Sequence, residues 1–216
     1  MHRTRMSPGR RFRHLTTWAV CAALSAGALV AWSAPPKPFP LTLTIVDGTS
    51  ASYRVREQLA GVNFPSDAVG RSTAVTGTIV FNEDGSIDSA RSKLSFDLRT
   101  LKSDQSMRDG YIQHRTLQTE QYPMAVFVPK SITGMPNPLT GQFGLELSGD
   151  MTIHGTTAPL TWQGIATVDD RSGIVAGRAT TNFTFEKFGM TVPKIFRVMS
   201  VADSITLEVA FRFKVD

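Results

Sequence analysis

Strict alternation of apolar and polar residues near the C terminus is the feature that most constrains this chain. From Ser204 to Val215, apolar residues beginning with Ile205 occupy every second position, and mostly polar residues fill the positions between them. Successive side chains of an extended strand point to opposite faces, so this pattern predicts a long β-strand with one buried face and one solvated face. The buried face of such a strand requires a partner layer.

The same alternation recurs along the chain and predicts about eight strands. Short sequences rich in Gly and Asp join consecutive strands: "NEDGS" at 82–86, "HGTTAP" at 154–159 and "DDRSG" at 169–173. Such short links indicate antiparallel neighbours. The predicted strands cover residues 53–59, 75–81, 94–98, 125–132, 143–153, 160–168, 175–185 and 204–215.

Eight long antiparallel strands are best closed into an all-β, up-and-down barrel, because closure removes both exposed edges. A two-sheet sandwich is the alternative, since alternation alone does not distinguish the two. The segment 103–118 interrupts the strand pattern. Ser103 or Asp104 could cap a short helix there, with Met107 and Tyr111 four residues apart on one face. We expect this helix to close one end of the barrel.

The first 33 residues have the order of a secretory signal peptide. Arginines at positions 3, 5, 10, 11 and 13 precede the apolar run Leu15–Trp32, and "SAPPKPFP" follows it. We therefore expect cleavage near Ser33 and Ala34 and a periplasmic or secreted protein. An uncleaved membrane anchor is the alternative, because the run approaches the length of a spanning helix. Residues 34–49 would then form a Pro-rich and Thr-rich tether, and residues 50–216 one domain.

The net charge of +5 comes from this leader. Without its five arginines the chain has 18 basic and 18 acidic residues, so the remaining domain lacks the positive charge that nucleic-acid binding requires. Cys21 is the single cysteine and lies in the leader. A mature chain would therefore have no disulfide, no thiol nucleophile and no thiolate metal site.

The stretch "MRDGYIQHRTLQTEQYP" at 107–123 can be interpreted as an active site or as a lid. Catalysis by His114 would need a partner such as Asp109, but residues five apart do not share a helix face well. Arg108 and Asp109 are better explained as a structural ion pair or helix cap. His114 and His154 lack clustered carboxylates, and no nucleophile-elbow, phosphate-binding or dinucleotide motif is present. We therefore predict a lid, with no catalytic residue and no metal site.

Two stretches resemble a known family. The segment "SFDLRTLKSDQSMRDGYIQHRTLQTEQYPMAVF" at 95–127 is similar to the central signature of the YceI-like polyisoprenoid-binding proteins, with its Thr-Leu turn, Arg-Asp pair and Tyr-Pro before a strand. The segment "GDMTIHGTTAPLTW" at 149–162 is similar to the second signature of that family. The resemblance implies an exported, lipocalin-like barrel over roughly residues 50–215 that encloses an isoprenoid or related lipid chain.

The residues themselves also suggest a hollow barrel. Small residues, among them Gly77, Gly149, Gly164 and Gly177, occupy inward mid-strand positions where a filled barrel would place Leu or Ile. Bends or bulges at these glycines are the alternative explanation. We expect the lid to consist of Met107, Tyr111 and Ile112. We expect the lipid-binding wall to consist of Phe81, Phe96, Phe127, Phe143, Leu145, Leu147, Trp162, Phe183, Phe185, Leu207 and Phe211.

Two functions are compatible with these expectations. The first is a non-enzymatic protein that encloses an isoprenoid or similar long apolar chain for transport, storage or sequestration, with transient membrane contact for lipid exchange. The second is an enzyme of the isomerase or cyclase type that acts on a lipid within the same barrel. We expect no cofactor other than a bound isoprenoid-type lipid, and no nucleic-acid partner.

Overall fold

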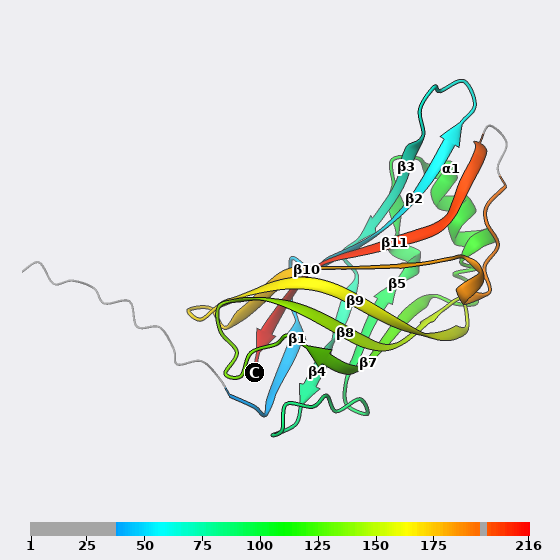
Figure 1. Ribbon diagram of the computed structural model, residues 1–216. Coiled ribbons are helices and arrows are strands. Elements are labelled where there is room, and N and C mark those ends of the chain that lie inside the picture. The colour runs from blue at the N-terminus through cyan, green and yellow to red at the C-terminus, as the bar shows by residue number, and fades with distance from the viewer. Residues whose placement is uncertain (1–37, 195–197) are drawn as a thin grey trace, which may run out of the picture. The chain divides into compact units, whose positions relative to one another are not determined.

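The computed structural model describes residues 38–194 and 198–216. The leader expected at 1–33 lies outside these ranges, as do residues 34–37 of the expected tether. Within them, β-strands dominate, and a short helical segment covers residues 106–116 (Figure 1).

In the described part of the chain, eight strands form a closed antiparallel ring. Each strand pairs with the next in the order β1, β4, β5, β7, β8, β9, β10 and β11, and β11 pairs back with β1 through Val215 and Leu43. This closure confirms the predicted barrel and excludes the sandwich. The strands are β1 (Leu41–Ile45), β4 (Val75–Phe81), β5 (Lys93–Asp97), β7 (Met124–Thr133), β8 (Gln142–Ile153), β9 (Thr156–Asp169), β10 (Ile174–Phe183) and β11 (Val198–Val215).

Three further strands extend the wall at one end. β2 (Ser50–Leu59) pairs with β11, β3 (Ser66–Ser72) pairs with β2, and β6 (Lys102–Ser103) pairs with β3, all antiparallel. Figure 1 shows β2, β3 and the first part of β11 projecting at the end that carries α1 (Ser106–Tyr111). β1 and β2 run in the same direction, and so do β3 and β4, and β5 and β6. When each of these pairs is counted as one pass, the described chain makes eight up-and-down passes.

The break between β1 and β2 is held by a buried threonine. Thr49 Oγ1 accepts a hydrogen bond from the backbone N–H of Arg212 at 3.0 Å. The same hydroxyl lies 3.0 Å from the carbonyl oxygen of Val46 and 3.2 Å from that of Arg212, to which it can donate. A side chain thus replaces ladder hydrogen bonds where the strand bends, which keeps the buried backbone groups of β11 satisfied.

Three strands were not predicted from the sequence: β1, β3 and the two-residue β6. β1 lies inside the expected tether 34–49, so the barrel begins earlier than predicted. The run is short, and only Leu41, Leu43 and Ile45 carry its alternation. β3 was not predicted because its inward residues Ala68, Gly70 and Ser72 are small and two of them are not apolar.

The predicted turn at 154–159 is tighter than its sequence suggested. β8 and β9 are joined by His154 and Gly155 alone, with φ values of 51° and 73°. Positive φ at both central residues is the requirement of a type I′ hairpin turn, whose twist matches that of the strands. His154 therefore has a backbone role in the turn, as expected from its position.

The inward glycines do not all leave open space. A Cβ added at Gly149 would lie 2.8 Å from Cζ of Phe127, and one added at Gly177 would lie 2.6 Å from Cζ of Phe211. Aromatic rings from neighbouring strands therefore cover these positions. The expectation that the glycines leave volume is wrong at these two sites, because the space above a glycine is available to a ring on the adjacent strand.

The segment between β6 and β7 is helical, as predicted, and continues beyond its α-helical part. α1 (Ser106–Tyr111) runs directly into a π-helical turn, η2 (Ile112–Thr116). Neither Ser103 nor Asp104 is the N-cap. Gln105 takes that position, and Ser103 instead donates to Oδ1 of Asp109 from its backbone N–H at 2.8 Å and from its hydroxyl at 2.7 Å.

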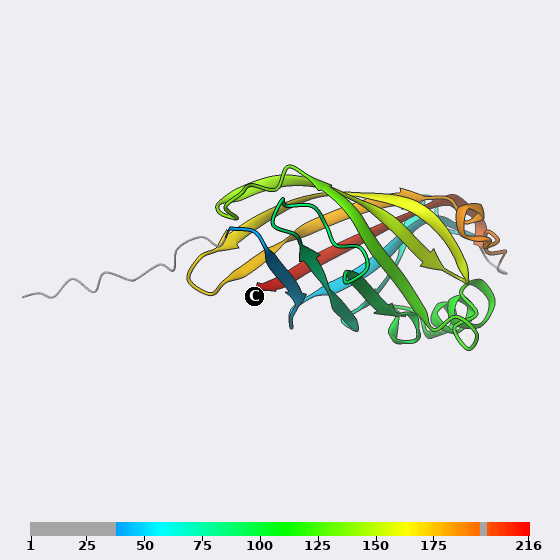
Figure 2. The same ribbon diagram turned by 90° about the horizontal axis from the view of Figure 1, so that it is seen from below.

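Two 3₁₀ turns complete the described elements: η1 (Leu98–Thr100) and η3 (Glu186–Phe188). Both views place the helical segment at the end of the barrel away from the C terminus (Figures 1 and 2). Within the described ranges, no helix has the length and apolar character needed to span a membrane.

Candidate functional site

An apolar cavity of about 240 Å³ lies inside the barrel. All strands of the ring contribute to its lining, together with β2, β3 and the helical segment. A cavity of this size lined by aliphatic and aromatic side chains stays dry and accepts apolar molecules. The polar residues of the lining are Ser52, Tyr53, Glu57, Ser95, Arg108 and Thr116.

Most of the residues expected in the wall lie along this cavity. Phe81 is the exception: its side chain is buried, but it stacks on Phe39 with ring centroids 5.3 Å apart and lies outside the lining. The alternation placed Phe81 on the inward face correctly, but stacking on Phe39 at the end of the barrel turns the ring of Phe81 away from the cavity. The lining includes Phe96, Phe127, Phe143, Leu145, Leu147, Trp162, Phe183, Phe185, Leu207 and Phe211.

Trp162 occupies a central place in the wall. It pairs across β8 and β9 with Leu147 and packs edge-on against Phe127, with ring centroids 6.3 Å apart. Only 8% of the residue is exposed. The indole is therefore both a wall residue and part of the hydrophobic core, and its emission is a natural reporter of cavity occupancy.

The helical segment lines the cavity with only one of the three residues first expected. Ile112 lines the cavity as predicted, and Arg108, Thr116 and Leu117 join it. Met107 does not: it is 87% exposed. Met107 and Tyr111 instead border a shallow depression on the outer side of the segment. The four-residue spacing placed them on one helical face correctly, but that face points away from the cavity.

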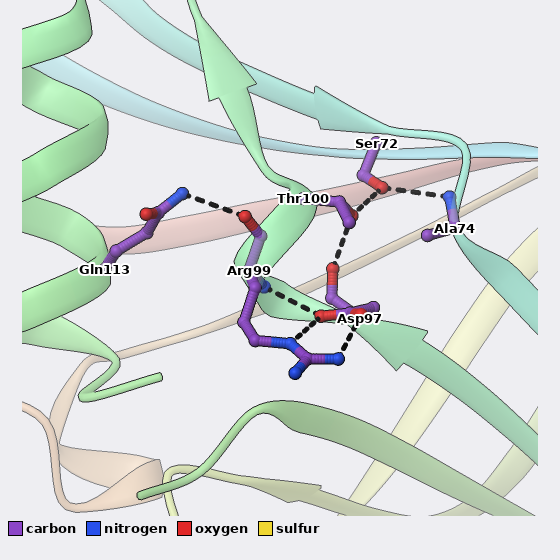
Figure 3. Close-up of polar contacts among 6 residues, drawn as sticks. All are labelled: Ser72, Ala74, Asp97, Arg99, Thr100 and Gln113. Carbon is purple, nitrogen blue, oxygen red and sulfur yellow. Dashed lines mark hydrogen bonds and ion pairs between the residues drawn. The ribbon is translucent and has the colours of Figure 1, made fainter. Parts of the chain in front are cut away.

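A polar network connects the helical segment to the barrel (Figure 3). Asp97 accepts hydrogen bonds from Arg99, including one from Nη2 at 2.7 Å, and this contact lowers the pKa of the Asp97 carboxyl. Thr100 donates to the carbonyl oxygen of Asp97 at 2.7 Å and bonds to the hydroxyl of Ser72. Gln113 donates to the carbonyl oxygen of Arg99 at 3.1 Å. These bonds connect the helical segment to β3 and β5.

A buried ion pair connects α1 to β2. Nη2 of Arg108 in α1 lies 2.7 Å from Oε1 of Glu57 in β2, and the two side chains are 15% and 8% exposed. Arg108 also donates to Asp104, one helical turn earlier. The expectation that Arg108 pairs with Asp109 is wrong, because Asp109 accepts from Ser103 instead.

Tyr53 is the third ionisable residue of the lining. Burial raises the pKa of its phenol, and the positive charge of Arg108 opposes this shift only in part. Sequence reasoning missed Tyr53 and Glu57 as site residues. The alternation places Tyr53 and Glu57 on the same strand face as Val55. A glutamate on an inward face is unusual unless it is paired, and this could have identified Glu57 as a site residue.

The two histidines of the described chain have different surroundings. Nδ1 of His114 lies 3.6 Å from Glu120 on the exposed side of the helical segment. His154 packs edge-on against Tyr122, with ring centroids 5.0 Å apart. No group of three or more His, Cys, Asp or Glu residues in the described ranges could hold a metal ion.

Fold and cavity define a closed antiparallel β-barrel with an internal apolar chamber and a helical cover. Residues 46–213 match the YceI-like domain, and the chain belongs to that family. A relative from Pseudomonas putida, a UPF0312 protein, is 34% identical over 123 residues. That match covers 52% of this chain and 62% of the relative, so the chain spans less than two thirds of the relative's length.

Solved structures share the fold at low identity. A polyisoprenoid-binding domain from Saccharophagus degradans is 10% identical, with a TM-score of 0.62, and the match covers 82% of this chain and all of that domain. BcnA from Burkholderia cenocepacia is 16% identical, with a TM-score of 0.53, over 78% of this chain and 96% of that one. The YCEI protein of Campylobacter jejuni is 13% identical, with a TM-score of 0.53, over 72% and 88%. At these identities the likeness shows the fold alone.

Proposed function

We propose that this protein binds an isoprenoid or similar long apolar chain in the barrel cavity. The observation that carries this proposal is the cavity of about 240 Å³, whose lining is apolar apart from a few side chains. Transfer from water into such a site releases about 0.8 kcal/mol for each methylene-sized group, so a few isoprene units suffice for useful affinity. The shared fold with a polyisoprenoid-binding domain supports the same ligand class.

We further propose that the bound lipid is carried, stored or sequestered without chemical change. The residues first considered for catalysis have separate surroundings, which supports this: Asp109 accepts from Ser103, and His114 faces Glu120 at the surface. The alternative is an enzyme of the isomerase or cyclase type, which would change the lipid chemically.

The proposed setting is the periplasm or the outside of the cell, supported by the leader-like sequence at 1–33. Transient membrane contact belongs to the same proposal, because the lipid must enter and leave. Exposed apolar residues at the α1 end support it: Val62 and Phe64 in the β2–β3 loop, Met107 in α1 and Met199 at the start of β11 (Figure 1). Apolar residues exposed together mark interaction sites.

The test is native mass spectrometry of the protein purified from its own host, followed by extraction of the bound molecule. We expect an apolar lipid, and we expect added lipid to be recovered unchanged after incubation. A cavity-filling variant, Ala179→Phe, should lose most of the bound lipid. Its control is Arg178→Phe on the exposed face of the same strand, which should keep it. A chemically altered product would establish the enzyme instead.

A further inference from the structure

The polar side of the cavity is concentrated at the α1 end. In the described chain, the ionisable residues of the lining are Tyr53 and Glu57, both on β2, and Arg108 on α1. Tyr53 and Glu57 share a strand face with the intervening Val55, and Arg108 reaches Glu57 at 2.7 Å. The remainder of the cavity offers a ligand almost only apolar contact, so a polar group on the ligand would be recognised here.

Tyr53 lies close to the backbone of β3, yet its hydroxyl has no hydrogen-bond partner among the described residues. Tyr53 and Gly70 are cross-strand partners, and a Cβ at Gly70 would lie 2.2 Å from Cε1 and 2.9 Å from the phenolic oxygen of Tyr53. The ring therefore lies against the bare backbone of β3. The oxygen is buried and has no hydrogen-bond partner among the described residues. A buried polar group without a partner costs about 1–3 kcal/mol, which a ligand could recover.

Tyr53 also remains a hydrogen-bond donor. A tyrosine phenol is protonated at neutral pH, and burial raises the pKa of Tyr53 further, with Asp109, Glu57 and Asp104 acting in the same direction. A protonated phenol donates one hydrogen bond and accepts others. An oxygen acceptor on the ligand would satisfy it.

The charges at this end do not suit an anion. Both terminal nitrogens of Arg108 are engaged, one by Glu57 and the other by Asp104. Two carboxylates thus face one guanidinium, and the lining residues of the described chain supply no further cation. A diphosphate or carboxylate head would lose its hydration there and meet two carboxylates that already share the charge of Arg108.

We propose that the α1 end of the cavity recognises an uncharged head group whose oxygen accepts a hydrogen bond from Tyr53, with the Arg108–Glu57 pair as the polar boundary of the site. This inference rests on the proposed function and names the ligand class within it. The ligand is an apolar chain that ends in a carbonyl, ether or hydroxyl oxygen. Chains that end in a diphosphate or carboxylate are excluded by the charge of the site.

Three probes with the same farnesyl chain test the proposal: farnesal, the hydrocarbon farnesene and farnesyl diphosphate. Affinities are measured by equilibrium dialysis with wild type, Tyr53→Phe and Gly70→Ala. We expect wild type to bind farnesal most tightly and the diphosphate least. Tyr53→Phe should weaken farnesal binding roughly threefold to tenfold, as expected for one hydrogen bond, and leave farnesene unchanged. Gly70→Ala, which displaces the ring, should also remove the preference for farnesal.

Tyr122→Phe is the matched control, because Tyr122 packs on His154 outside the cavity lining and should not affect any probe. Thermal unfolding of each variant reports whether the barrel is intact. Two results would overturn the head-group site and leave the proposed binding of an apolar chain intact. One is that the diphosphate binds most tightly, and the other is that Tyr53→Phe and wild type bind farnesal with equal affinity. If no probe binds to folded protein, the proposed function fails together with the inference.

Discussion

Removing Arg108 should lower the free energy of unfolding more than removing its partner Glu57. In Arg108→Met, the carboxylate of Glu57 stays buried, with 8% of its side chain exposed, and loses its cation. Leaving one charge of a buried pair uncompensated costs about 3–5 kcal/mol. In Glu57→Gln, Arg108 keeps its contact with Asp104, and the new amide oxygen can still accept a hydrogen bond. We expect that variant to lose about 1–3 kcal/mol.

Urea unfolding followed by the emission of Trp162 measures both losses in a chain that starts at Ala34. Wild type is compared with each single variant and with the double variant Glu57→Leu, Arg108→Met. The double variant should be more stable than Arg108→Met alone, because neither charge is then buried. Equal losses in the two single variants, or a larger loss in Glu57→Gln, would refute the assignment of Asp104 as the second partner of Arg108.

Four further outcomes are expected. Trp162→Ala should lose about 3–5 kcal/mol of stability and bind farnesal more weakly; wild-type emission should change saturably with farnesal, and no change at full occupancy would remove Trp162 from the site. Shortening 103–118 should speed lipid exchange in stopped-flow measurements while circular dichroism shows an intact sheet; an unchanged rate would count against a lid. N-terminal sequencing of exported protein should begin close to Ala34, and a start at Met1 would contradict cleavage. The pKa of Tyr53 is raised in the folded state. The buried phenol therefore contributes to the free energy of unfolding below pH ~10, and this contribution falls as pH rises above that value. Tyr53→Phe should therefore lose less stability than wild type between neutral and strongly alkaline pH, and an equal loss would argue against the buried phenol.

The barrel was predictable because alternation is a local property that repeats in each strand. Leu145, Leu147 and Trp162 could be assigned to the inner face from their own neighbours in sequence, and short turns such as that at His154 indicated antiparallel pairing. β3 was not predicted because its inward residues are small, and the Tyr53 ring that covers Gly70 lies on another strand. A small residue at an inward position gives no indication, in the sequence, of the aromatic ring that covers it.

The amino-acid sequence by itself determined eight of the strands, their inward faces, the helical interruption at 103–118 and the family resemblance. Each of these depends on residues close together in the chain. Only the tertiary structure decided that β1 belongs to the barrel and that the rings of Phe127 and Phe211 cover glycines. It also decided that Arg108 pairs with Glu57, 51 residues away, beside the unsatisfied hydroxyl of Tyr53. These features depend on the spacing and twist of strands that meet only when the barrel closes, and no local pattern carries that information.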